Sequence, residues 1–319
     1  MFEQFFSQDY MVAFLNSIIR MSTPLIFCAI GALIADHAGT MNMALEGIML
    51  SASFAAVYFS ALTSSMWGGI IGALFGGCII SSLLAYFHLF KKSDLIITGI
   101  ALNTFASGGT SYLLFLTTGE KTTSRLLRSL QAPQVNIPYI QDIPILGEVL
   151  SGHNVLTYSS FICIIIVYVL IFKSRFGLRV RAVGHNPNAA NSIGLNVRKI
   201  KFRALLISGA FASLGGAFMS MGYLSYFARD MIAGRGYIGL AAATLASGKP
   251  FGTLLAALGF GTANAFSITL ATMNLNADLV AMLPYAATIL GLVLISARKL
   301  AIEKGKTKLV NKIMEEKKL

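Results

Sequence analysis

Side chains that could do chemistry are scarce in the long apolar stretches of this sequence. Glu46 opens one of these stretches, and Asn103 lies inside another. Inside a membrane, a carboxylate or an amide can hold a proton, an ion or a polar solute, or it can join two helices by hydrogen bonds. These two residues are therefore the first candidates for a functional site.

Metal, thiol and nucleotide chemistry have little support in the sequence. The four histidines lack the HExxH or paired spacing that suits zinc. The three cysteines lie in apolar stretches, where they predict neither a disulfide nor a metal site. Position 300 is leucine, whereas a Walker A loop ending at Gly305-Lys306-Thr307 would need glycine there. We expect no cofactor in this chain and no enzymatic activity, with energy supplied by another subunit.

The composition indicates which elements must position the candidate side chains. Of the 319 residues, 55% are hydrophobic and only 12% are charged, whereas soluble domains carry about 25% charged residues. A helix needs about 20 apolar residues to cross a membrane, and the uncharged windows are continuously apolar, unlike the alternating strands of a barrel. We predict an all-α polytopic transmembrane bundle of eight to ten spans from the windows 47–90, 95–119, 149–172, 204–228, 250–277 and 279–297.

The basic residues predict the orientation of these spans. Residues 173–203 contain eight Lys or Arg and no acid, the tail 298–319 contains eight more, and Lys91 and Lys92 form a third group. By the positive-inside rule these regions are cytoplasmic. The formal net charge of +12 therefore reflects membrane topology, and no nucleic-acid partner is predicted. The tail is expected to contact membrane lipid.

Counting the crossings predicts one that is hidden. If residues 173–203 and the tail are both cytoplasmic, an even number of crossings separates them, yet the long windows there supply three. The missing crossing is predicted at Met231–Ser247, which Gly234-Arg235-Gly236 interrupts and Gly248-Lys249-Pro250 follows. A break within hydrocarbon is tolerated where the freed backbone meets protein or a water-filled cavity, so we expect this broken or re-entrant helix near a pathway.

The domain boundaries follow from the same pattern. We expect an amphipathic interfacial segment at 1–20, a transmembrane domain at 21–297 and a basic cytoplasmic tail at 298–319. The transmembrane domain would contain an external loop at 119–154, a cytoplasmic loop at 174–202 and a cytoplasmic turn at 246–251. A basic region is missing before the first apolar stretch, so a cleaved signal peptide is not expected. The side of the amino terminus stays open.

Four stretches carry a resemblance to a known family, the membrane permeases of ATP-binding-cassette (ABC) importers of the ribose and branched-chain amino acid type. Residues 39–47 are similar to the family pattern G-x-x-N-x-x-x-E-G, and residues 98–103 to a G-x-x-L-N helix. Residues 174–197 resemble the family's cytoplasmic loop, and residues 233–252 its glycine-rich segment. The sequence looks closest to the branch that takes up nucleosides and simple sugars. His185 stands where the family often has an acidic residue, so a charge role there is in doubt.

The resemblance implies the fold and the partners of the protein. It implies a type II importer fold in the plasma membrane, with two permeases around one pathway, two cytoplasmic ATPase subunits and an extracellular substrate-binding lipoprotein. The nucleoside branch often pairs two different permeases, so a heterodimer is expected and a homodimer stays open. Uncharged windows suit a neutral polar solute, but they do not identify it.

Candidate site residues fall into two groups. Glu46 could accept hydrogen bonds from a solute or simply be stabilised at a helix start, and the asparagines could contact solute or join helices. The pathway candidates are Asn42, Glu46, Asn103, Gly234, Gly236 and Asn264. The candidates for coupling to the ATPase are Arg179, Arg181, Gly184, His185, Asn186, Pro187, Ser247, Gly248, Lys249 and Pro250.

Two other classes of function stay open at this point. Glu46 could instead be the coupling acid of an ion-driven secondary transporter, since such carriers need a titratable group deep in the bundle. The chain could also be a membrane-embedded enzyme or scaffold. Solute uptake after deletion would separate these classes.

Overall fold

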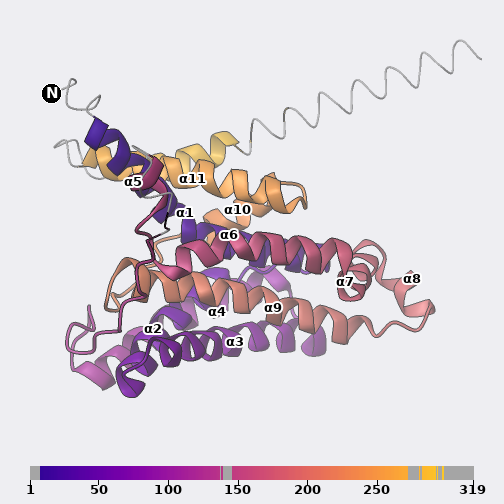
Figure 1. Ribbon diagram of the computed structural model, residues 1–319. Helices are drawn as coiled ribbons and strands as arrows, with labels where there is room; N and C mark the ends of the chain where they lie inside the picture. Colours follow the sequence, from indigo (N-terminus) through magenta and orange to yellow (C-terminus); the bar gives the residue numbers. More distant parts are fainter. Residues whose placement is uncertain are drawn as a thin grey trace, which may run out of the picture.

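The protein is a bundle of long helices in the computed structural model (Figure 1), which describes residues 8–136, 138, 146–271, 280, 282–291, 293 and 297. The longer helices are α1 (Gln8–His37), α2 (Leu45–Thr63), α3 (Met66–Lys91), α4 (Leu95–Thr118), α6 (Val155–Tyr168), α9 (Val197–Ala217) and α11 (Pro250–Ala271). The shorter ones are α5 (Leu146–Leu150), α7 (Arg175–His185), α8 (Pro187–Ser192) and α10 (Arg235–Leu245). Single π-helical segments, Val169–Lys173 and Phe218–Tyr223, extend α6 and α9.

The prediction of a polytopic helical membrane protein is confirmed. Among the described residues, six helices are long and apolar enough to cross a membrane: Tyr10–His37, Leu45–Thr63, Met66–Lys91, Val155–Lys173, Val197–Tyr223 and Pro250–Ala271. Helix α4 is equally long and uncharged, but its Thr, Ser, Asn and Gly residues lower its mean hydropathy. The structure describes most of the predicted span 279–297, where residues 283–291 are helical, whereas the tail 298–319 lies outside the described residues.

A short helix, α10, lies within the segment Met231–Ser247 where the hidden crossing is predicted. Helix α10 has 11 residues and is about 16 Å long, which is half of what a bilayer requires. The other half is the non-helical segment 224–234, whose Phe227 carbonyl accepts a hydrogen bond from Ser124 N at 2.8 Å. Residues 224–245 together return the chain to the end of the bundle that carries α7 and α8, which we call the basic end (Figure 1).

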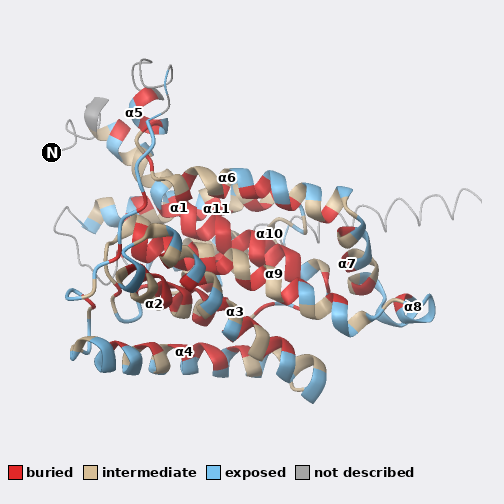
Figure 2. Ribbon diagram, turned by 60° about the horizontal axis from the view of Figure 1, so that its bottom comes forward, coloured by how far each residue is buried: buried red, intermediate tan, exposed pale blue. Residues whose placement is uncertain are grey.

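Helix α1 forms the centre of the bundle. Its residues from Leu25 to Ala35 are almost completely buried, whereas α4 lies at one edge with a long exposed face (Figure 2). The predicted amphipathic segment at 1–20 and the first predicted span are joined, because α1 runs through Arg20 without a break. The helix therefore reaches from the basic end to the opposite end of the bundle.

The described part of the predicted external loop is bound to the broken crossing. Ser129 Oγ donates to the Ser220 carbonyl at 2.6 Å, and Ser129 N donates to the Ser225 carbonyl at 2.9 Å. Thr123 forms an isolated antiparallel bridge with Ala228. These bonds satisfy backbone groups that segment 224–234 would otherwise leave unpaired.

Candidate functional site

Glu46 closes the break in the crossing. It lies in the first turn of α2, and its Oε1 and Oε2 accept hydrogen bonds from Gly234 N at 2.8 Å and Gly236 N at 2.7 Å. The carboxylate therefore acts as an N-cap for α10 from a different helix, which suits the positive end of the helix dipole. Gly236 is required there, because a Cβ on it would lie only 2.6 Å from Glu46 N. Arg235 completes the turn by donating to the Ile232 carbonyl at 2.9 Å.

Asn103 joins three helices at the same depth. Its Oδ1 accepts from Gly47 N at 2.8 Å, and its Nδ2 donates to the Met43 carbonyl at 2.9 Å and to Tyr237 Oη at 2.8 Å. The amide thus links α4 to the start of α2 and to α10. Of the alternatives left open by the sequence, the structure places Asn103 in interhelical hydrogen bonds. Tyr237, which is 43% exposed, was not predicted.

Replacing Asn103 with leucine should lower the thermal midpoint of the purified transporter by an amount equivalent to about 1–3 kcal/mol, because the backbone groups of α2 lose their partners. Asn264→Leu is the matched control, since the Asn264 amide donates to the Phe260 carbonyl at 3.0 Å within its own helix. The midpoints of both variants would be measured by heating the protein and labelling the cysteine thiols that unfolding exposes. Equal midpoints for the two variants would contradict the bridging role of Asn103.

Asn42 lies between α9 and the turn that precedes α2. It is fully buried, its Nδ2 donates to Ser208 Oγ at 3.0 Å, and its Oδ1 accepts from Ala44 N at 3.1 Å. These bonds hold the turn before α2 against α9. The predicted pathway residues therefore separate into a cluster around Glu46 and Asn103, with Asn42 and Asn264 outside it.

A polar, exposed strip continues from this cluster. On α4, Thr104 and Gly108 are exposed, and Ser107 donates to Asp230 Oδ1 at 2.6 Å. Tyr237 lies on the neighbouring α10, and Tyr285 Oη donates to the Ala233 carbonyl at 3.1 Å. The same face of α4 carries the exposed Ile97, Ile100 and Phe115 towards its ends. Hydroxyl groups and small residues thus line the middle of this face beside the broken crossing, where a polar solute could find hydrogen-bonding partners.

The predicted cytoplasmic loop is a set of short capped helices at the basic end. Ser174 caps α7 through Gly177 N at 3.0 Å, Asn186 caps α8 through Ala189 N at 3.0 Å, and Asn196 caps α9 through Lys199 N at 3.0 Å. Pro187 occupies the first turn of α8, where its missing N–H costs nothing. Each cap fixes the start of a helix, so the loop has a defined shape.

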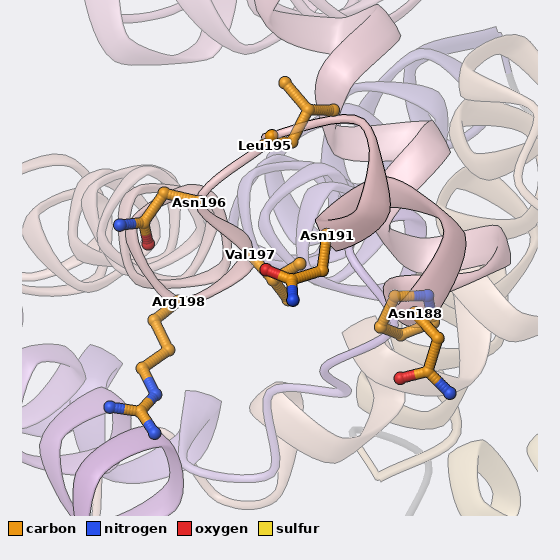
Figure 3. Close-up of a pocket in the computed structure, with 8 residues that line it drawn as sticks. Asn188, Asn191, Leu195, Asn196, Val197 and Arg198 are labelled. Atoms are coloured by element: carbon orange, nitrogen blue, oxygen red, sulfur yellow. The ribbon is translucent and has the colours of Figure 1, made fainter.

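A hollow of about 610 Å³ lies between α8 and the start of α9. Figure 3 shows Asn191 pointing into it, with Asn188 and Arg198 on either side. The amides can donate hydrogen bonds to a protein partner or accept them from it, and the guanidinium can donate them. The exposed Arg179 and His185 lie on α7, and the exposed Pro187 lies at the start of α8.

The predicted coupling turn joins α10 to α11. Ser247 and Gly248 have φ values of 50° and 80°, and Lys249 N donates to the Ala246 carbonyl at 3.1 Å. Lys249 and Ser247 are exposed, whereas Pro250 is buried at the start of α11. The turn therefore presents a compact, polar tip at the basic end.

One aromatic cluster connects the loop with this turn, and the sequence did not reveal it. The Phe172 ring lies 5.7 Å from the His37 ring, 5.6 Å from the Tyr168 ring and 5.1 Å from the Arg181 guanidinium. Tyr168 in turn contacts Phe251 of α11 at 5.7 Å. We call His37, Tyr168, Phe172 and Phe251 the aromatic cluster.

His37 also lies close to Gly184 of α7 and to Gly248 of the turn between α10 and α11. A Cβ at Gly248 would lie 3.1 Å from His37 Cε1, and a Cβ at Gly184 would collide with the His37 carbonyl. Gly184 is thus needed for the close approach of α7 to the end of α1. The aromatic cluster, α7 and the turn 246–249 consequently form one packed unit.

Among the residues that the structure describes, no three His, Cys, Asp or Glu side chains gather closely enough to hold a metal ion. Cys28 instead packs at the break, with Sγ 3.4 Å from the Gly236 carbonyl. At the end opposite α7, burial lowers the pKa of His153, whose Nε2 lies 2.9 Å from the Val149 carbonyl. The described residues around Glu46 and Asn103 are joined by hydrogen bonds and packing contacts. Such contacts can bind a solute and hold alternative helix positions.

Comparisons with known proteins agree with this arrangement. The family model described as branched-chain amino acid transport system, permease component, matches residues 14–297. The guanosine ABC transporter permease protein NupQ of Bacillus subtilis is 32% identical over 85% of this chain and 88% of its own length. The nucleoside ABC transporter permease protein NupC of Lactococcus lactis is 32% identical over 88% and 91%. A second guanosine permease protein of B. subtilis, NupP, is 28% identical over 77% and 71%.

Proposed function

Because the chain belongs to the family of branched-chain amino acid transport system permease components, and is a membrane permease subunit of an ABC importer, we propose that it moves nucleosides or a related small polar solute into the cell. The single observation that carries this proposal is the capped break at Glu46. It places a discontinuous crossing beside a polar strip, while the same crossing ends at a turn on the basic end. Discontinuous helices at mid-membrane are typical of transport pathways.

The solute class is inferred from the polar strip and from the relatives. Thr104, Ser107 and Tyr237 offer hydroxyl groups, and the Glu46 carboxylate is already engaged by two backbone amides. A neutral molecule rich in hydroxyl and ring nitrogen atoms, such as a nucleoside, suits such a surface. The pathway residues are then Glu46 and Asn103 as supports of the break, with Gly234 and Gly236 forming its backbone.

The proposed ATPase contact is the basic end. The loop with Arg179, Arg181, His185 and Asn186 and the turn with Lys249 both reach this end and meet at His37. Two elements that share one packed unit can transmit a partner's motion to α10. ATP would be bound and hydrolysed on the partner, and the basic residues favour a cytoplasmic position for this end and for the tail.

The remaining partners follow from the exposed strip and from the importer class. Residues of α4 are exposed along its length (Figure 2), so an enclosed path requires a second permease against this face. A heterodimer with a related permease is proposed, and a homodimer is the alternative. An extracellular binding lipoprotein would deliver the solute at the end that carries α5.

Uptake of radiolabelled guanosine tests the proposal. Inactivating the partner ATPase by replacing its Walker A lysine should abolish uptake, because ATP hydrolysis on the partner would supply the energy for transport. Uptake that survives this change and collapses with a protonophore would show an ion-driven carrier instead. Competition by unlabelled nucleosides, but not by glucose, is the result expected for the nucleoside branch.

A further inference from the structure

The ends of α3 and α9 enclose a second hollow at the basic end, of about 360 Å³. The two helices pack along each other, with Ser81 Oγ donating to the Leu205 carbonyl at 2.6 Å. Six residues line the hollow: Phe90, Asn196, Arg198, Lys199, Phe202 and Arg203. The surface of the hollow is almost entirely apolar, so the carbon chains of the three basic residues line it together with the two aromatic rings. Arg198, Lys199 and Arg203 are themselves exposed.

The depth of this hollow follows from the charge pattern of the two helices. The uncharged window 47–90 ends directly before Lys91, and the window 204–228 begins directly after Arg203. The boundary between hydrocarbon and water on both helices therefore lies at these cations. Phe90, which is 54% exposed, lies on the apolar side of that boundary. The hollow consequently spans the headgroup level and the first part of the acyl region.

The charge of the hollow is uncompensated among the residues that line it. None of the six is acidic, and the sequence has no Asp or Glu from 149 to 229. The closest acid in sequence to Lys92 is Asp94, whose Oδ1 accepts hydrogen bonds from Ile96 N and Ile97 N at the start of α4. Arg198, Lys199 and Arg203 are exposed without an acidic neighbour in the lining, so they attract an anionic group at the membrane surface, and Lys91 and Lys92 add to the same field.

We propose that this hollow between α3 and α9 binds an anionic phospholipid, with an acyl chain packed in it on Phe90 and Phe202 and the headgroup phosphate paired outside it with the exposed Arg198, Lys199 and Arg203. Basic pockets between transmembrane helices bind such headgroups. A lipid fits better than a free phosphate because the aromatic side chains adjoin the exposed apolar face of α3, where Phe87 is 40% and Tyr86 is 44% exposed. This site is independent of the solute that the protein transports.

Lipid retention measured by native mass spectrometry tests the proposal. The full chain, alone and assembled with its ATPase subunits, is equilibrated with an equimolar mixture of phosphatidylglycerol and phosphatidylcholine. The unmodified chain should retain phosphatidylglycerol preferentially. The variant Arg198→Gln/Arg203→Gln should bind it about 10- to 30-fold more weakly, since each cation near the membrane surface contributes about 1 kcal/mol.

The matched control is Lys173→Gln/Arg175→Gln, which removes two cations from the end of another span at the basic end. It should keep the lipid preference within about twofold. The proposal is overturned by equal loss in both variants, or by the absence of any preference in the unmodified chain. Displacement of the lipid by inorganic phosphate would indicate a free-anion site, and displacement by the ATPase subunits would indicate a docking surface. Either result rejects a lipid site.

Discussion

The variant Glu46→Ala will lose solute uptake almost completely while still being inserted in the membrane. Two backbone N–H groups, of Gly234 and Gly236, lose their shared acceptor, and a charge-assisted hydrogen bond contributes about 1.5–3 kcal/mol. A loss of about 3 kcal/mol lowers the population of the capped break by about 100-fold. Guanosine uptake per inserted protein, together with the thermal midpoint in detergent, measures the effect.

Two further variants test whether the loss of uptake comes from the missing cap or from the missing negative charge. Glu46→Gln keeps one acceptor oxygen, so its uptake should lie between those of the alanine variant and the unmodified protein. Glu148→Ala removes an exposed carboxylate from α5 and should leave uptake unchanged. Normal uptake and a normal thermal midpoint in Glu46→Ala would show that α10 does not need this cap.

Replacing Phe172 with alanine should separate ATP hydrolysis from transport. The change removes the ring that contacts His37, Tyr168 and Arg181, and each aromatic or cation–π contact contributes about 0.5–1.5 kcal/mol. We expect the partner ATPase to retain its activity, while the solute transported per ATP hydrolysed falls about 10-fold, a change equivalent to about 1.4 kcal/mol. Both rates are measured on the same vesicles.

The controls for this prediction are a conservative and a distant substitution. Phe172→Tyr retains the ring and should restore the ratio, whereas Phe75→Ala removes a 60% exposed ring from α3 and should not change it. Combining Phe172→Ala with Gly248→Ala should give less than additive effects, because both residues act through His37. A proportional fall of hydrolysis and transport in Phe172→Ala would contradict the coupling role.

The sequence predicted the bundle and its break because both leave local signals. Uncharged windows mark the spans. Parity and the glycines predicted a broken crossing at Met231–Ser247, and the 11-residue α10 lies within that segment. The continuity of α1 through Arg20 could not be predicted, since a charge there is equally compatible with a helix end. The predicted count of eight to ten spans also drew on 279–297, which the described residues cover only in part.

The partners of the candidate side chains could not be predicted, because they depend on contacts between distant segments. Glu46 and Gly234 are 188 positions apart, and Asn103 and Tyr237 are 134 apart. His37 was one of four scattered histidines, and no spacing rule relates it to Phe172 or Gly248. A polar side chain within a membrane can form its hydrogen bond with any neighbouring helix. The role of Glu46 as a cap for α10 could therefore be recognised only from the folded structure.

The burial of α1 has a mechanical consequence. Its residues from Leu25 to Ala35 are almost completely buried, and α10 with the turn after it lies against α1 from Cys28, at the Gly236 carbonyl, to His37, at Gly248. Helix α1 is therefore a fixed support for the broken crossing. Any shift of α10 along it must break the two hydrogen bonds to the Glu46 carboxylate, so this one side chain sets a large part of the energy that such a movement costs.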